Sequence, residues 1–366
     1  MRTEIVDAER IVVKVGSSSL TDPRGHLDPE RVEQLADLLS GLRHNGKKVV
    51  LVTSGAIAAG LGPLKLKRRP RDLETQQAAA AVGQGQLLRA YSDAFARHDQ
   101  IVAQLLLTID DVLRPKTYRN ALNTISRLFR LGVVPIVNEN DTVATHEIRF
   151  GDNDRLAALI AHLIRADALL LFSDVDGLYT AHPDEPGSEL IAHVDDVSAL
   201  AVDTSRVGSK VGTGGMRTKL QAADIATQAG IGVVLTHADL LGPALAGEEV
   251  GTYFAPTRKR RPRRLLWLAF AAEPRGSVSV DDGARAALEA GGASLLVPGI
   301  KAVDGTFAEG EPIEILGLDG GVIGRGFTAY SSATLAAEIA RSRAASGRDR
   351  QRAVVHRDRM ILIANH

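Results

Sequence analysis

The chain contains no cysteine and few aromatic residues, with one tryptophan and 4% Phe, Trp and Tyr among its 366 residues. The lack of thiols excludes disulfides, thiolate nucleophiles and Cys-based zinc or iron–sulfur sites, and it is compatible with a reducing compartment. No uninterrupted apolar stretch approaches the length that crosses a bilayer, and charged residues precede the first short apolar run. We therefore predict a cytoplasmic protein with no membrane association, whose chemistry does not depend on sulfur.

The chain also lacks net charge, because 44 Lys and Arg residues balance 44 Asp and Glu residues. A neutral molecule has no general attraction to nucleic acid or to anionic membranes. Basic residues gather only locally, in residues 258–264 and in the tail from Arg341, whereas residues 276–340 carry three basic and nine acidic side chains. Because this acidic balance would repel a phosphate backbone, we expect no nucleic-acid partner, and RNA binding through the basic segments stays as an alternative.

Over residues 1–254, short β-branched apolar runs alternate regularly with longer helical patterns. This alternation is typical of a three-layer α/β/α domain built around a largely parallel sheet. The predicted strands lie at residues 11–15, 49–53, 101–107, 133–137, 168–173 and 231–236, and the predicted helices at residues 29–43, 73–97, 118–131, 154–165 and 216–229.

A basic segment with two prolines ends this first domain. We interpret residues 255–275 as a solvated linker, because short strand patterns and glycine turns replace the long helices in residues 276–353. These features favour a small β-rich barrel domain, followed by a C-terminal tail at residues 354–366. The predicted strands of the second domain lie at residues 277–280, 294–297, 312–316 and 322–328.

The most informative motif is a glycine-rich run at residues 212–219 that opens a predicted helix and ends in Lys219. Its glycines allow backbone N–H groups at the positive end of the helix dipole to approach an anion. The pattern suits a nucleotide polyphosphate, and a surface loop before an ordinary helix is the alternative. Lys14, within the first predicted strand, is a second lysine that needs an anionic partner unless it extends from an edge strand into water. Two ammonium groups beside a transferring phosphoryl group would neutralise its charge.

Polar residues follow several predicted strands at their carboxyl ends, where ligands bind in parallel α/β sheets. Ser54 follows the second strand, Asp141 follows the fourth, and Ser173 and Asp174 end the fifth. The polar run at residues 152–154 lies at a predicted helix start, where one such residue is expected as a cap. Three in succession exceed what a cap needs, so they predict substrate recognition and a carboxylate that orients the lysines.

Together these segments resemble the amino acid kinase family, in the branch that phosphorylates L-glutamate and carries a C-terminal PUA domain. The resemblance covers the whole chain in family order and spacing. It implies ATP-dependent phosphorylation of the L-glutamate side-chain carboxylate to L-glutamyl 5-phosphate, with Mg²⁺, as the first step of L-proline biosynthesis. The segments that carry it are Val13–Ser17, Thr53–Gly60, Gln77–Gln84, Pro135–Thr142, Phe150–Asp154, Ser173–Thr180 and Gly212–Leu220.

The resemblance also implies roles for individual residues. Lys14 and Lys219 would stabilise the transferring phosphoryl group, and Asp154 would organise the two lysines. The residues implied to hold glutamate are Ser54, Asp141 and Asn153. The residues implied to line the ATP site are Lys14, Ser173, Asp174, Thr213, Gly214, Gly215, Met216, Arg217, Thr218 and Lys219. Mg²⁺ would be held by the nucleotide phosphates and water, and the sequence leaves open which protein groups, if any, contact it.

As partners, the resemblance implies a homo-oligomer, dimer or tetramer, with glutamyl phosphate reductase as the enzyme that receives the product. It further implies inhibition by L-proline, although Gln76 and Leu122 replace charged residues that are common in the family near the glutamate and inhibitor region. Related kinases that act on acetylglutamate, aspartate, carbamate or a uridine nucleotide are the nearest alternatives. The sequence Ser54-Gly55-Ala56 and the second domain favour glutamate.

Overall fold

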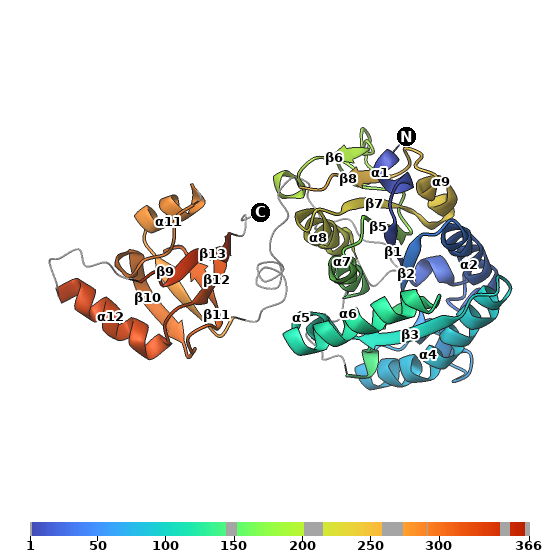
Figure 1. Ribbon diagram of the computed structural model, residues 1–366, viewed down its shortest axis with the longest axis horizontal. Helices are drawn as coiled ribbons and strands as arrows, with labels where there is room; N and C mark the ends of the chain where they lie inside the picture. Colours follow the sequence, from blue (N-terminus) through green and yellow to red (C-terminus); the bar gives the residue numbers. More distant parts are fainter. Residues whose placement is uncertain are drawn as a thin grey trace. The chain divides into compact units, whose positions relative to one another are not determined.

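The structure is a computed structural model that describes residues 2–143, 152–200, 215–257, 274–290, 292–344 and 352–362. The chain forms two compact units, Met1–Arg260 and Arg261–His366. Each unit has its own sheet (Figure 1). Each unit also has its own hydrophobic core. Most of the predicted linker, residues 258–273, lies outside the described part of the chain.

The first unit is built on an eight-stranded sheet with the order β3-β4-β2-β1-β5-β7-β8-β6. Neighbouring strands are parallel except for the antiparallel pair β7 and β8. The six predicted strands are confirmed, with ends shifted by at most two residues. Strands β6 and β8 were missed because two or three residues are too few to show the alternation of apolar and polar side chains. The strands are β1 (Arg10–Val15), β2 (Lys48–Thr53), β3 (Val102–Leu107), β4 (Val134–Glu139), β5 (Ala168–Ser173), β6 (His193–Val194), β7 (Gly232–His237) and β8 (Thr252–Phe254).

Helices cover both faces of this sheet, which confirms the three-layer prediction. One face packs against α2 and α4, and the other against α6, α7 and α8. The helices are α1 (Thr3–Val6), α2 (Pro29–His44), α3 (Ala56–Leu61), α4 (Leu73–Ala96), α5 (Ile109–Leu113), α6 (Pro115–Arg130), α7 (Asp152–Ile164), α8 (Met216–Gln228) and α9 (Leu241–Leu245). No helix among the described residues is long and apolar enough to span a membrane.

Alternate side chains of β1 point to opposite faces of the sheet, so its core residues and Lys14 lie on different faces. Ile11, Val13 and Val15 belong to the buried cluster that also contains residues of α2. Because successive side chains of a strand point to opposite faces, Lys14 projects toward the face covered by α7 and α8. A lysine in a central strand is thereby placed on the same side as the starts of these two helices.

Helices α3 and α4 cross with their backbones in contact. A Cβ atom at Gly83 would lie 1.7 Å from the carbonyl oxygen of Ala56, and one at Gly60 would lie 2.0 Å from that of Ala79. Gly55 begins α3 with φ of 103°, a conformation that favours glycine. The crossing therefore requires glycine at Gly60 and Gly83. It also positions the segment between β2 and α3, which contains Ser54.

The second unit has a five-stranded sheet with the order β10-β9-β11-β12-β13, and its described residues include two helices, so the β-rich prediction is confirmed. The pair β9 and β11 is parallel and the other pairs are antiparallel. The strands are β9 (Gly276–Val280), β10 (Ile300–Gly305), β11 (Pro312–Leu316), β12 (Val322–Thr328) and β13 (Val355–Leu362), and the helices are α11 (Asp282–Glu289) and α12 (Ser332–Ala344).

Two expectations for this unit are wrong. The predicted strand at residues 294–297 is reduced to a single antiparallel bridge between Leu295 and Val355, because Val297–Gly299 form a 3₁₀ turn around a proline that cannot donate to a ladder. Residues 355–362 are not a tail but strand β13, which pairs with β12. The strand was missed because its central residues are charged, whereas its buried residues lie at the two ends.

Candidate active site

Three charged side chains meet at the carboxyl edge of the first sheet. The ammonium group of Lys14, near the end of β1, lies 2.5 Å from Oδ1 of Asp154 in the first turn of α7. The ammonium group of Lys219, in the first turn of α8, lies 3.4 Å from Oδ2 of the same carboxylate. All three are buried, with 6%, 1% and 5% of their surface exposed for Lys14, Asp154 and Lys219. The structure thus brings together the three residues that the sequence marked as catalytic.

Burial and mutual charge set the protonation of this cluster. Burial lowers the pKa of Lys14, and the carboxylate of Asp154 opposes that shift. Burial alone would raise the pKa of Asp154, but the two ammonium groups and a hydrogen bond from Thr218 lower it to about 2. Asp154 is therefore an anion at neutral pH. Two cations facing one anion in a buried site leave an excess of positive charge, which favours an anionic ligand.

The start of α8 adds backbone donors to the same edge. Gly215 is the N-cap in an extended conformation, and no side chain caps the helix. The first N–H groups of such a helix carry the positive end of the dipole and can receive a phosphate. Thr218 donates a hydrogen bond of 2.9 Å to Oδ2 of Asp154, so its hydroxyl orients the carboxylate.

The other residues predicted to line the nucleotide site differ in their placement. Met216 is buried and Arg217 is exposed, so the two point in different directions from the first turn of α8. Thr213 and Gly214 lie outside the described residues. A Cβ atom at Gly16, directly after β1, would lie 3.7 Å from the ammonium nitrogen of Lys14, so this strand end comes close to the lysine.

Ser173 and Asp174 lie at the end of β5, next to β1. The hydroxyl of Ser173 donates a 2.8 Å hydrogen bond to Oδ1 of Asp174, and Ser173 is buried. The negative charge of Asp174 raises the pKa of Lys14, against the effect of burial. Asp174, held by Ser173, therefore belongs to the electrostatic surroundings of Lys14.

A second cluster joins the ends of β2 and β4 to the start of α7. The side-chain amide of Asn153 donates to Oγ of Ser54 at 3.0 Å and to Oδ1 of Asn138 at 3.2 Å. Its Oδ1 accepts a hydrogen bond of 3.3 Å from the backbone N–H of Glu139. Because Asn153 and Asp154 are consecutive, this polar cluster is directly adjacent to the charged one. Such an array of hydroxyl and amide groups suits the polar ends of an amino acid.

Asp141 begins the 3₁₀ turn η2 (Asp141–Val143), two residues after β4. Burial raises the pKa of Asp141 to about 6, and the guanidinium group of Arg69 opposes this rise. Burial makes it costly in free energy for this carboxylate to ionise without a positive partner. The ammonium group of a ligand would offset this cost of desolvation.

Sequence reasoning missed three contributions to the site. Asn138 is 1% exposed and accepts hydrogen bonds from Asn153 and from the backbone of Glu139. The sequence placed it in the polar run that follows the fourth predicted strand but assigned it no role. The orienting bond from Thr218 and the charge of Arg69 near Asp141 carry no sequence signal, because both depend on segments distant in the chain.

Taken together, this edge of the sheet can bind a polyanion against two lysines and a helix start, with an amino acid in the adjacent polar cluster. Neutralising charge on a transferring phosphoryl group is the electrostatic work that such a site performs. Among the described residues, no group of three His, Cys, Asp or Glu side chains is arranged to hold a metal ion.

Comparison with known proteins agrees with this geometry. Residues 9–237 match the model of the amino acid kinase family, and residues 276–346 match that of the PUA domain. The chain is 54% identical to glutamate 5-kinase of Cutibacterium acnes, over 99% of this chain and 93% of that protein. It is 52% identical to glutamate 5-kinase of Thermobifida fusca, over 100% and 96%. The structure of carbamate kinase from Giardia lamblia bound to AMP-PNP aligns with a TM-score of 0.50 at 18% identity, over 69% of this chain and 99% of that one, which shows the shared fold.

Proposed function

The chain belongs to the amino acid kinase family, and from this premise we propose that it is a glutamate 5-kinase, which transfers the γ-phosphoryl group of ATP to the side-chain carboxylate of L-glutamate. The products are L-glutamyl 5-phosphate and ADP, in the first step of L-proline biosynthesis. The observation that carries the proposal is the buried carboxylate of Asp154 between Lys14 and Lys219, adjacent to the polar cluster around Asn153.

The reaction requires charge neutralisation more than proton transfer. The side-chain carboxylate of glutamate is ionised at neutral pH, so its oxygen can attack phosphorus without a general base. A new O–P bond forms while the bond to the leaving ADP oxygen breaks. We propose that Lys14 and Lys219 neutralise the oxygens around phosphorus, and that Asp154 holds both ammonium groups in place.

We propose that glutamate binds in the polar cluster. Ser54 and Asn153, already hydrogen-bonded to each other, would hold the substrate's polar groups, and Asp141 would receive its ammonium group. The substrate's ammonium group would add to the charge of Arg69 in compensating the carboxylate of Asp141, whose pKa burial raises.

We propose that the nucleotide lies along the ends of β1 and β5 and the start of α8. Lys14, Ser173, Asp174 and the residues from Gly215 to Lys219 would line it, together with Thr213 and Gly214. Mg²⁺ is proposed to be held by the phosphates with water in its shell, which is usual for this ion.

The test is ADP release by the purified chain with Mg-ATP and, separately, L-glutamate, N-acetyl-L-glutamate, L-aspartate or carbamate. Hydroxylamine is included to trap an acyl phosphate as a hydroxamate. We expect L-glutamate alone to give both ADP and hydroxamate. A different preferred substrate would overturn the assignment of Ser54, Asp141 and Asn153 while leaving the phosphoryl-transfer site intact.

We also propose a homo-oligomer, delivery of the product to glutamyl phosphate reductase, inhibition by L-proline and a cytoplasmic location, as expected of a biosynthetic kinase. Light scattering measures the oligomer, mixing with the reductase measures any rate enhancement, and added L-proline in the ADP assay measures inhibition. RNA binding by the second unit is the less favoured role, because residues 276–340 carry more acidic than basic side chains.

A further inference from the structure

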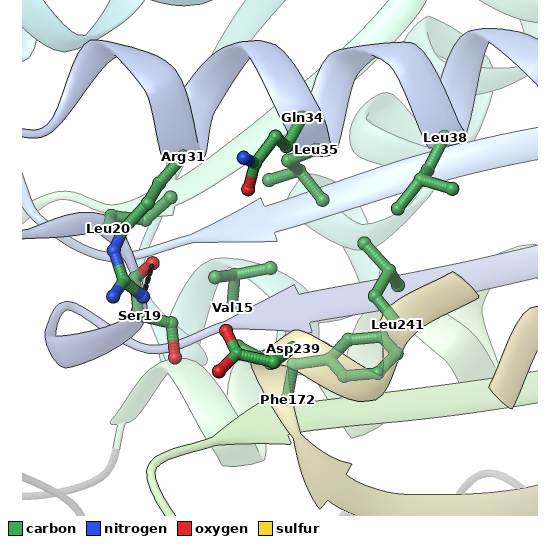
Figure 2. A pocket seen from close by; sticks show the side chains of 11 residues that line it. Val15, Ser19, Leu20, Arg31, Gln34, Leu35, Leu38, Phe172, Asp239 and Leu241 are labelled. Carbon is green, nitrogen blue, oxygen red and sulfur yellow. Dashed lines mark hydrogen bonds between the residues drawn. The ribbon is translucent and has the colours of Figure 1, made fainter. Parts of the chain in front are cut away.

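A cavity of about 110 Å³ lies in the first unit, on the opposite face of the sheet from Lys14. It is enclosed by α2, by the ends of β1 and β5, and by the segment from η5 (Ala238–Leu240) to α9 (Figure 2). Val15 and Phe172 form its floor, and they are the residues next to Lys14 and Ser173 in the two central strands. A ligand here would contact residues that are adjacent in sequence to Lys14 and Ser173 of the candidate active site.

The cavity has a polar end and an apolar end. Figure 2 shows Arg31, Ser19 and Asp239 grouped at one end, and Leu38 and Leu241 at the other. Leu38 is an apolar residue with 38% of its surface exposed. An apolar wall is a poor site for ordered water, and the volume exceeds the roughly 30 Å³ that one water occupies. The apolar end therefore has room for a small hydrocarbon group.

The charged groups at the polar end are not paired with each other. The guanidinium of Arg31 makes two long contacts, one to the carbonyl oxygen of Ser19 at 3.5 Å and one to the carboxylate of Asp28 at 3.6 Å. The carboxylate of Asp239 lies 3.4 Å from Nδ1 of His237, and this nitrogen accepts a hydrogen bond from the backbone N–H of Asp239. A cation and an anion thus face one small cavity, each able to take a further partner.

A third polar group points to a ligand independently. Oγ of Ser19 is buried and has no hydrogen-bond partner among the described residues, and the residue is 7% exposed. Buried hydroxyls without a partner are uncommon, because desolvation without a hydrogen bond is costly. A bound group with a donor or an acceptor would satisfy this hydroxyl.

We propose that this cavity is a second ligand site, separate from the glutamate site, for a small α-amino acid with a branched apolar side chain. The carboxylate of the ligand pairs with Arg31, its ammonium group pairs with Asp239 and Ser19, and its side chain enters the apolar end beside Leu38 and Leu241. Glycine lacks the apolar group, and glutamate would place a charge against leucine side chains, so neither fits.

The test is isothermal titration calorimetry of the full chain with L-leucine as the probe. The comparison ligands are glycine, 4-methylpentanoate, which lacks the ammonium group, and 3-methylbutylamine, which lacks the carboxylate. We expect L-leucine to bind at least about tenfold more tightly than each of the three, because each loses a charged hydrogen bond or the apolar contact. Saturating L-glutamate should leave L-leucine binding unchanged.

The variants Arg31→Leu and Asp239→Asn should each weaken L-leucine binding about tenfold or more. Leu38→Trp should abolish it by filling the apolar end. Arg89→Leu and Asp93→Asn are matched controls on α4, with side chains 80% and 75% exposed, and they should bind like the unmodified chain. Circular dichroism verifies the fold of each variant.

No binding of L-leucine, displacement by L-glutamate, or unchanged binding in the Arg31 and Asp239 variants would overturn the proposal. None of these readouts depends on kinase activity, so the result is separate from that of the ADP assay.

Discussion

At the scale of single residues, Asp154 is the group on which the candidate active site depends. A buried carboxylate is costly unless it is paired, and here it contacts Lys14, Lys219 and the hydroxyl of Thr218. The same contacts hold two ammonium groups in one place before any substrate binds. Such preorganisation lowers the barrier because the charges need not be rearranged during the reaction.

Replacement of Lys219 by alanine should lower kcat by about a hundredfold or more, since one of the two cations beside the phosphoryl group is lost. The fold should persist, because Asp154 keeps Lys14 as its partner. Steady-state ADP release measures the effect. The control is Arg89→Ala, which removes an exposed cation from α4, outside the candidate active site, and should leave kcat nearly unchanged. Near-normal turnover of the Lys219 variant would remove this lysine from the mechanism.

The raised pKa of Asp141 predicts a specific pH dependence. Its carboxyl group becomes protonated as the pH falls through about 6, and it then loses its attraction for the ammonium group of glutamate. We expect kcat/KM for glutamate to fall about tenfold between pH 7 and pH 5, while the side chain of glutamate itself stays mostly ionised. In Asp141→Asn the value should be low at both pH values and the slope should disappear. An unchanged slope in that variant would assign the titration to another group.

At the scale of elements, the crossing of α3 and α4 controls the position of Ser54. The close approach at Gly83 leaves no space for a methyl group, because the carbonyl oxygen of Ala56 occupies it. Gly85, two residues later on the same helix, is exposed, and a Cβ atom added there would meet nothing within 4 Å. One helix therefore contains a glycine required by packing and a glycine that packing does not require.

Gly83→Ala should lower the free energy of unfolding by roughly 1–3 kcal/mol or more, since the two helices must move apart. Gly85→Ala should leave it unchanged or raise it by up to about 1 kcal/mol, because alanine is the better helix former. Urea denaturation of both variants makes the comparison. Equal stability of the two would show that the crossing adjusts without cost. A raised KM for glutamate is expected only for the Gly83 variant.

At the scale of the whole molecule, the two units have separate hydrophobic cores and separate sheets. The charged and polar clusters of the candidate active site belong entirely to the first unit. The second unit depends on β13 to complete its sheet, with Val355 and Ile361 buried in it. We therefore expect the two units to fold independently of each other.

A fragment of residues 1–257 should fold and retain glutamate-dependent ADP release, because the core and site of the first unit lie within it. It should unfold in one cooperative transition on heating, whereas the full chain should show the sum of two transitions by calorimetry. Loss of near-UV circular dichroism in the fragment would mean that the first unit requires the second for stability.

Local patterns in the sequence determined the alternation of strands and helices, the glycine-rich start of α8 and the polar residues at the strand ends, because period and turn chemistry are short-range properties. Only the tertiary structure decided that Thr218 orients Asp154, that Asn138 supports Asn153, and that residues 355–362 form a strand. These features depend on strand order and on contacts between distant segments, such as the 64 residues that separate Thr218 from Asp154. Local sequence patterns do not give the distance in space between residues that are far apart in the chain. The folded chain brings these groups within hydrogen-bonding distance.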